Sequence, residues 1–106
     1  MQIIEQVKTL LGIDDDLQDK QLQVIQALTE SHLKSYTGQV VIPKDLEFVI
    51  VEVMVKRFNR VGAEGMTSQS MEGLSNNYDN HSDFDEYRAL LQRRFGDDMN
   101  VGFKML

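Results

Sequence analysis

The stretch PKDLEFVIVEVMVKRFNRV, residues 43–61, decides the fold class. Its apolar residues recur at helical spacing and form one continuous stripe, made of Leu46, Val49, Ile50, Val53, Met54, Phe58 and Val61. The β-branched run 49–55 is also compatible with a strand, but the length, the proline at the start and the interspersed charges favour a helix. Phe48, Val51 and Val55 lie off the stripe, as in a helix at the centre of a core or at an oligomer interface. Because one helix of a small bundle is rarely buried on every side by its own neighbours, we expect self-association through this helix.

Two further helices are predicted before this stretch. Residues 2–11 place apolar side chains at helical spacing and end at Gly12, and residues 17–37 do the same and end at Gly38. His32 falls on the apolar stripe of the second of these helices, where we expect it to be hydrogen-bonded at the edge of the core.

After residue 62 the composition changes to glycine, serine and asparagine. A structureless loop of this length is uncommon inside a compact domain, so we expect residues 63–82 to project as a hairpin-like loop with arms at 66–70 and 74–78. A fourth helix is predicted over 83–95, with Asp83 to Glu86 at the spacing of a capping box and Gly96 as its end. Apolar residues alternate in 97–106, which indicates an extended C-terminal arm. The fold class is therefore all-α: a small bundle of about four helices in a single domain, 1–106, with a long loop and an extended arm.

Composition excludes several classes of function. The 106 residues include no cysteine, which excludes disulfides, a thiol nucleophile and thiolate metal sites. No apolar run approaches the roughly 20 residues that span a bilayer, and the first residues carry no basic segment typical of a signal peptide. The net charge of −6 argues against a protein that reads nucleic acid in a groove. The charge is −3 over 1–42, +1 over 43–62 and −4 over 63–106.

No motif for catalysis, cofactor binding or metal binding emerges. His81 lies among acidic residues, but a single histidine beside carboxylates is weak support for a metal or acid–base site, and a capping cluster is the better explanation. The acids at 14–16 and 19 lack the ligand pattern of a calcium loop. Lys56, Arg57 and Arg60 form the one basic cluster. It is explained equally well by the dipole at the end of a helix and by contact with an acidic partner.

Residues 57–78, RFNRVGAEGMTSQSMEGLSNNY, resemble the signature region of the head–tail connector family of tailed, siphovirus-type phages, also called DNA-packaging or head-completion proteins. The residues that match the family pattern are Asn59, Arg60, Gly62, Glu64, Gly65, Ser70, Gly73, Ser75 and Tyr78, and Phe58 stands where the family often has tyrosine. The opening VKTLLGI at 7–13 and the Ile42-Pro43 pair are also similar to the family. The resemblance covers almost the whole chain, is specific over 57–78, and is least at 97–106.

The resemblance implies a structural virion protein without enzymatic activity. It would assemble with copies of itself into a ring, twelve-fold in the virion, between the portal protein and the next neck or tail-completion protein. The ring would continue the DNA channel, and acidic excess suits a channel through which DNA passes without specific binding. The expected location is the neck of the virion, after assembly in the host cytoplasm, with no membrane contact and no cofactor.

We expect subunit and partner contacts along the third helix, at its basic end, in the loop and in the C-terminal arm. The candidate interface residues are Val51, Val55, Lys56, Arg57, Asn59, Arg60, Gly62, Glu64, Gly65, Ser70, Gly73, Tyr78 and Phe103. The alternative function is a small helical regulatory or adaptor module that dimerises through the third helix.

Overall fold

The computed structural model describes residues 2–64 and 78–103, with side chains placed for 2–61 and 83–96, and these ranges contain helices and no strand. The predicted all-α class with about four helices is confirmed. None of the helices in the described ranges is long and apolar enough to cross a membrane. The α-helices are α1 (Ile3–Leu11), α2 (Asp19–Thr37), α3 (Glu47–Glu64) and α5 (Arg88–Phe103), and the 3-10 helices are η1 (Lys44–Leu46) and η2 (Tyr78–Tyr87).

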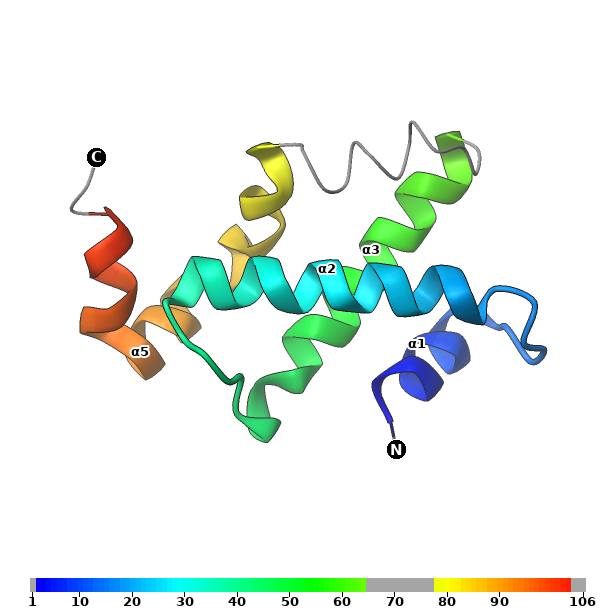
Figure 1. Ribbon diagram of the computed structural model, residues 1–106, viewed down its shortest axis with the longest axis horizontal. Coiled ribbons are helices and arrows are strands. Elements are labelled where there is room, and N and C mark those ends of the chain that lie inside the picture. Colours follow the sequence, from blue (N-terminus) through cyan, green and yellow to red (C-terminus); the bar gives the residue numbers. More distant parts are fainter. Residues whose placement is uncertain (1, 65–77, 104–106) are drawn as a thin grey trace.

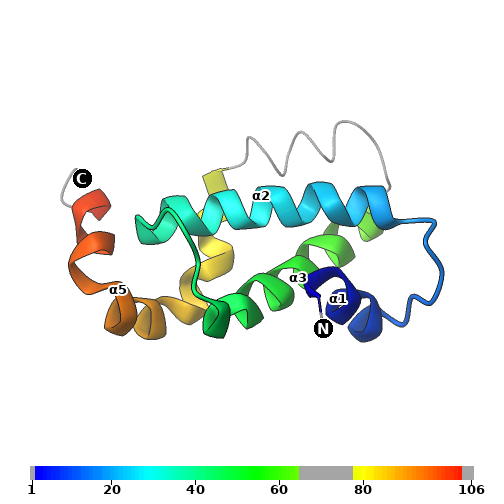
Figure 2. The same cartoon turned by 60° about the horizontal axis from the view of Figure 1, so that its bottom comes forward.

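Helices α2 and α3 cross at the centre of the molecule and form most of its core (Figure 1). Helix α1 packs against both of them on one side of the crossing, whereas η2 and α5 lie on the other side. The same arrangement is visible after rotation in Figure 2. This topology brings residues that follow position 77 back onto α2 and α3, which come earlier in the sequence.

Glycines end the first two helices where the sequence predicts. Gly12 and Gly38 have φ values of 73° and 72°, the left-handed conformation that glycine adopts without a steric penalty. The Gly38 amide donates to the carbonyl of Lys34 at 2.8 Å and so satisfies one of the last free carbonyls of α2. Helix α2 begins at Asp19, two residues after the predicted start.

The stretch 43–61 is helical, as predicted, but its first turn is a 3-10 helix. Pro43 keeps an extended ψ of 148° and stands before η1, and α3 begins at Glu47. The predicted stripe faces the core, where every member except the partly buried Phe58 is at most 3% exposed.

The apolar surplus of α3 is largely covered within the chain, which bears on one inference drawn from the sequence. Val51, which lies off the stripe, is only 4% exposed, Val55 is partly buried, and Phe48 remains 42% exposed. Helices α1, α2, η1 and η2 all contact α3 and cover Val51 and part of Val55, whereas Phe48 is left exposed. Burial of Val51 within the chain weakens the argument for self-association from an over-apolar helix, and self-association stays a prediction.

The structure also corrects the predicted ends of the loop and the predicted arm. Residues 63–64 belong to α3 and residues 78–82 to η2, whereas the rest of the predicted hairpin-like loop lies outside the described residues. The fourth helix starts as η2 and becomes α-helical at Arg88. Gly96, with φ 35° and ψ −97°, breaks α5, but the backbone of 97–103 is helical again, so the prediction of an extended arm was wrong there. A short alternation of apolar and polar residues is a weak signal for an extended segment. The acidic residues at 97–98 favour the start of a new helical turn.

Candidate functional site: a polar network between α3 and residues 83–87

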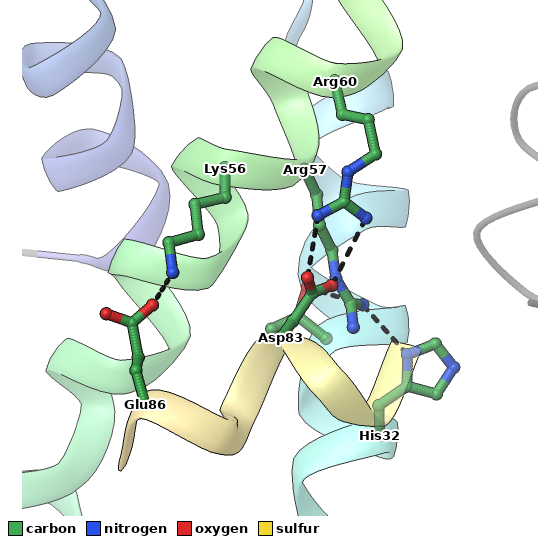
Figure 3. A network of polar contacts seen from close by, with 7 residues as sticks. His32, Lys56, Arg57, Arg60, Asp83 and Glu86 are labelled. Atoms are coloured by element: carbon green, nitrogen blue, oxygen red, sulfur yellow. Dashed lines mark hydrogen bonds and ion pairs between the residues drawn. The ribbon is translucent and has the colours of Figure 1, made fainter. Parts of the chain in front are cut away.

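Five consecutive residues, Asp83-Phe84-Asp85-Glu86-Tyr87, attach the end of η2 to α2 and α3. Each of the five side chains contacts one of these helices, and four of the contacts are polar. Figure 3 shows the contacts that Asp83 and Glu86 make with α3. We call these five residues and their polar partners, Tyr36, Glu52, Lys56, Arg57 and Arg60, the 83–87 network.

Asp83 is the centre of the network because its carboxylate bridges two guanidinium groups. Arg57 Nε donates to Asp83 Oδ2 at 2.9 Å, and Arg60 Nη2 donates to Oδ1 at 2.7 Å. The two arginines are three residues apart on α3, a spacing that places them on one helix face. The Arg57 side chain is 0% exposed and that of Asp83 is 7% exposed, so this ion pair is buried, whereas Arg60 is 41% exposed.

Helix α2 supplies further partners of Arg57. Its Nη1 lies 3.4 Å from Thr29 Oγ1 and 2.9 Å from His32 Nδ1. A guanidinium group only donates, so Nδ1 of His32 accepts and the ring is neutral in this arrangement. The predicted hydrogen bond of His32 at the edge of the core is confirmed, and its partner is Arg57.

Phe84 adds the apolar part of the attachment. Its side chain is fully buried, and its ring lies 5.6 Å from that of Tyr36 and 5.7 Å from the Arg57 guanidinium. The second of these distances allows a cation–π interaction. Burial of a phenylalanine contributes about 1.5–3 kcal/mol, so Phe84 supplies a large, non-directional part of the attachment.

The outer contacts of the network lie nearer to solvent. Lys56 pairs with Glu86, the hydroxyl of Tyr36 donates to Asp85 Oδ1 at 3.3 Å, and that of Tyr87 donates to Glu52. The Lys56 and Glu86 side chains are 45% and 51% exposed, and such pairs contribute at most about 1 kcal/mol. The buried core of the network is therefore the Asp83 bridge, and the rest forms its rim.

Burial and the polar contacts of the network shift the pKa values of Asp83, Arg57 and Tyr87. Burial alone would raise the pKa of Asp83, but the hydrogen bonds from Arg60 and Arg57 outweigh burial and hold that pKa below its usual value. Burial lowers the pKa of Arg57 although the bond to Asp83 opposes this shift. Burial, and then the bond to Glu52, raises the pKa of Tyr87.

The Asp83 bridge predicts a specific loss of stability in acid. Because the folded-state pKa lies below the value of about 3.9 in an unfolded chain, the bridge stabilises the fold at higher pH and loses its contribution as the pH falls below about 4. Thermal unfolding measured from pH 7 to pH 2 should show this loss in the wild type. In Asp83→Asn the dependence below pH 4 should be weaker, so that the two curves converge; parallel curves would contradict the assignment.

The structure pairs the predicted basic cluster with acids of its own chain, and contact of the exposed Lys56 and Arg60 with a partner stays a prediction. All three cations, Lys56, Arg57 and Arg60, form ion pairs with acids of residues 83–86 of the same chain. The Arg57 side chain is fully buried and cannot contact a partner, so the prediction of Arg57 as an interface residue is corrected. Asp83 was expected to cap a helix, and the structure instead places it inside η2 as the partner of the arginines.

The remaining candidate interface residues are distributed as follows. Val51 is buried, Val55 is partly buried and Asn59 is exposed. Gly62 and Glu64 lie in the last turn of α3, Tyr78 begins η2 and Phe103 ends α5, each placed by its backbone alone. Gly65, Ser70 and Gly73 lie outside the described residues. Among the side chains that the structure places, no group of three or more histidines and acids could hold a metal ion.

Comparison with known proteins identifies the family of the chain. No curated protein and no solved structure matches the sequence. A family model described as "Phage gp6-like head-tail connector protein" matches residues 1–94, which include the whole 83–87 network. This match spans most of the chain and agrees with the motif at 57–78 and with the all-α fold, and the protein therefore belongs to the phage gp6-like head-tail connector family.

Proposed function

We propose that the protein forms a ring between the portal and the neck or tail of a tailed phage and continues the channel for DNA. The match of the connector family to residues 1–94 carries this proposal. The family is one of structural connectors, so the chain is a virion component that assembles with other virion proteins. A ring of copies, twelve-fold in the virion, would meet the portal on one face and the next neck or tail-completion protein on the other. It would reach the neck after assembly in the host cytoplasm.

The exposed side of α3 is the surface that we propose for contact between subunits. Phe48, Glu52, Lys56 and Asn59 recur every three or four residues on this side and are all exposed. Val55, half-buried, lies among them. We propose that the 63–82 region and the C-terminal residues after Gly96 contact the portal or the adjacent ring.

The net charge of the chain supports a channel through which DNA passes without being bound. Net charge −6 repels phosphate, and the described arginines of α3 are paired with acids of their own chain. A ring built from such subunits would place a weakly repulsive surface around DNA.

Mixing the purified protein with the portal protein of the same phage genome and imaging the mixture by electron microscopy tests the proposal. We expect a ring stacked on the portal. Absence of any such ring, at concentrations where both proteins are folded, would contradict it.

A substitution on the exposed side of α3 tests the subunit contact. Asn59→Arg adds bulk and charge at an exposed helical position, so stability should change by less than about 0.5 kcal/mol, whereas ring formation on the portal should fall at least about tenfold, or 1.4 kcal/mol. Ser35→Arg, at an exposed position of α2, is the matched control and should assemble normally. Equal assembly of both variants, judged by sedimentation of the portal complex, would exclude this side of α3 as the contact.

A further inference from the structure

Glu86, which is exposed, and Tyr87, which is 9% exposed, lie against the exposed side of α3 and contact its side chains. Glu86 pairs with Lys56, Tyr87 donates to Glu52, and the ring of Tyr87 packs edge-on against that of Phe48 with centroids 6.2 Å apart. We call Phe48, Glu52, Lys56, Asn59, Glu86 and Tyr87 the composite face. Its shape depends on how residues 83–87 are aligned along α3.

The alignment of residues 83–87 along α3 is set by side-chain contacts across a long sequence separation. Arg60 and Asp83 are 23 positions apart, and Arg57 and Asp83 are 26 apart. Burial of Phe84 holds the segment against the helices, but the hydrophobic effect has no directional preference. A carboxylate shared between two guanidinium groups on successive turns of one helix does have a direction, because Oδ1 accepts from Arg60 and Oδ2 accepts from Arg57 and, at 3.5 Å, from Arg60.

The energetics of a buried ion pair point the same way. Replacing such a pair by apolar residues of similar volume is often neutral or stabilising, because desolvation of the charges offsets their attraction. The Asp83 bridge therefore contributes little stability that two apolar side chains could not supply. What apolar side chains cannot supply is the fixed alignment.

We propose that Asp83 is a positioning residue for assembly: by bridging Arg57 and Arg60 it aligns residues 83–87 on α3 and so gives the composite face the shape that a second copy of the chain recognises. This inference rests on the proposed function, because it assumes that the composite face lies between subunits. Alignment before binding lowers the cost of ordering on association, and its loss would weaken assembly without unfolding the protein.

The double variant Arg57→Met/Asp83→Leu tests the proposal, because it removes both buried charges and keeps the volume apolar. We expect it to keep its helical circular dichroism and to melt within a few degrees of the wild type. Amide hydrogen exchange of residues 83–87, measured before any portal is added, should become at least about tenfold faster, and ring formation on the portal should weaken at least about tenfold. Lys8→Met/Asp19→Leu is the matched control, because it removes another ion pair, 2.8 Å long, that joins α1 to α2. It should change neither readout for the composite face.

The outcomes separate this inference from the proposed function. If the wild type forms no ring, the proposed function fails, and unchanged exchange at 83–87 in the double variant would then overturn the positioning role as well. If the wild type and the double variant form rings equally well, Asp83 does not position the face. If the double variant unfolds, Arg60→Gln replaces it, because Arg60 is 41% exposed and only one arm of the bridge is lost. Faster exchange at 83–87 with weaker assembly in Arg60→Gln supports the proposal, and unchanged exchange overturns it.

Discussion

Asp83→Ala is expected to lower the free energy of unfolding by about 3–5 kcal/mol, because it leaves the charge of Arg57 buried without its carboxylate. The Arg57 side chain is 0% exposed, so water cannot replace the lost partner unless the surrounding structure opens. A loss of this size is a large part of the roughly 5–15 kcal/mol that stabilises a typical domain. Urea unfolding followed by circular dichroism at pH 7 measures it directly.

The matched control removes an acid from the same segment at an exposed position. Glu86→Ala breaks the pair with Lys56, whose two side chains are about half exposed, and should cost no more than about 1 kcal/mol. Arg57→Met should cost less than Asp83→Ala, because Asp83 would keep its bond to the exposed Arg60. Equal effects of Asp83→Ala and Glu86→Ala would mean that the Arg57 charge is solvated in the folded protein, contrary to the structure.

Arg57 is buried and Lys56 is exposed, and the sequence contains a signal for this difference in burial. Position 57 follows Val53 and Met54 by one turn and precedes Val61 by one turn, so it falls on the apolar stripe of α3. An arginine on such a stripe indicates a buried charge that needs a partner. Thr29 likewise interrupts the buried stripe of α2 between Ile25 and Leu33, and the structure places it beside Arg57.

The identity of the partner could not be predicted in the same way. The chain has seventeen acidic residues, and Asp83 lies 26 positions from Arg57. Local patterns report on neighbours within a few residues, whereas this pairing depends on how the chain returns to α3 after residue 77. The spacing of Asp83 to Glu86 also satisfies the capping-box pattern. The sequence therefore suggests a local capping role for Asp83, whereas the structure pairs it with Arg57 of α3.

Helix ends were predictable where glycine decides them and less so where tertiary contacts do. Gly12 and Gly38 end their helices because their φ values are positive. Gly96 also has a positive φ, yet the backbone continues as a helix beyond it. A glycine in the left-handed region therefore marked a break in each case, but whether the helix resumed depended on the residues that follow.

Phe84→Ala is expected to cost about 3–5 kcal/mol, as large apolar side chains in a packed core do. The substitution removes a fully buried ring and its contacts with the Tyr36 ring and the Arg57 guanidinium. Phe48→Ala is the matched control: Phe48 is 42% exposed, and its removal should cost at most about 1.5 kcal/mol. Urea unfolding of both variants gives the comparison. A loss below about 1.5 kcal/mol for Phe84→Ala, the size expected for removal of an exposed ring, would contradict its placement in the core.

The double variant Asp83→Ala/Phe84→Ala shows whether residues 83–87 detach as one unit. Both side chains contact Arg57, and neighbours that share a partner do not contribute additively to stability. If the segment separates from α2 and α3 once either contact is lost, the second substitution has few contacts left to remove. The double variant should then be only slightly less stable than the less stable of the two single variants. Additive losses would instead mean that the ion pair and the ring anchor the segment independently. In that case Asp83 would retain its alignment role without Phe84, and the polar bridge alone would hold residues 83–87 against α3.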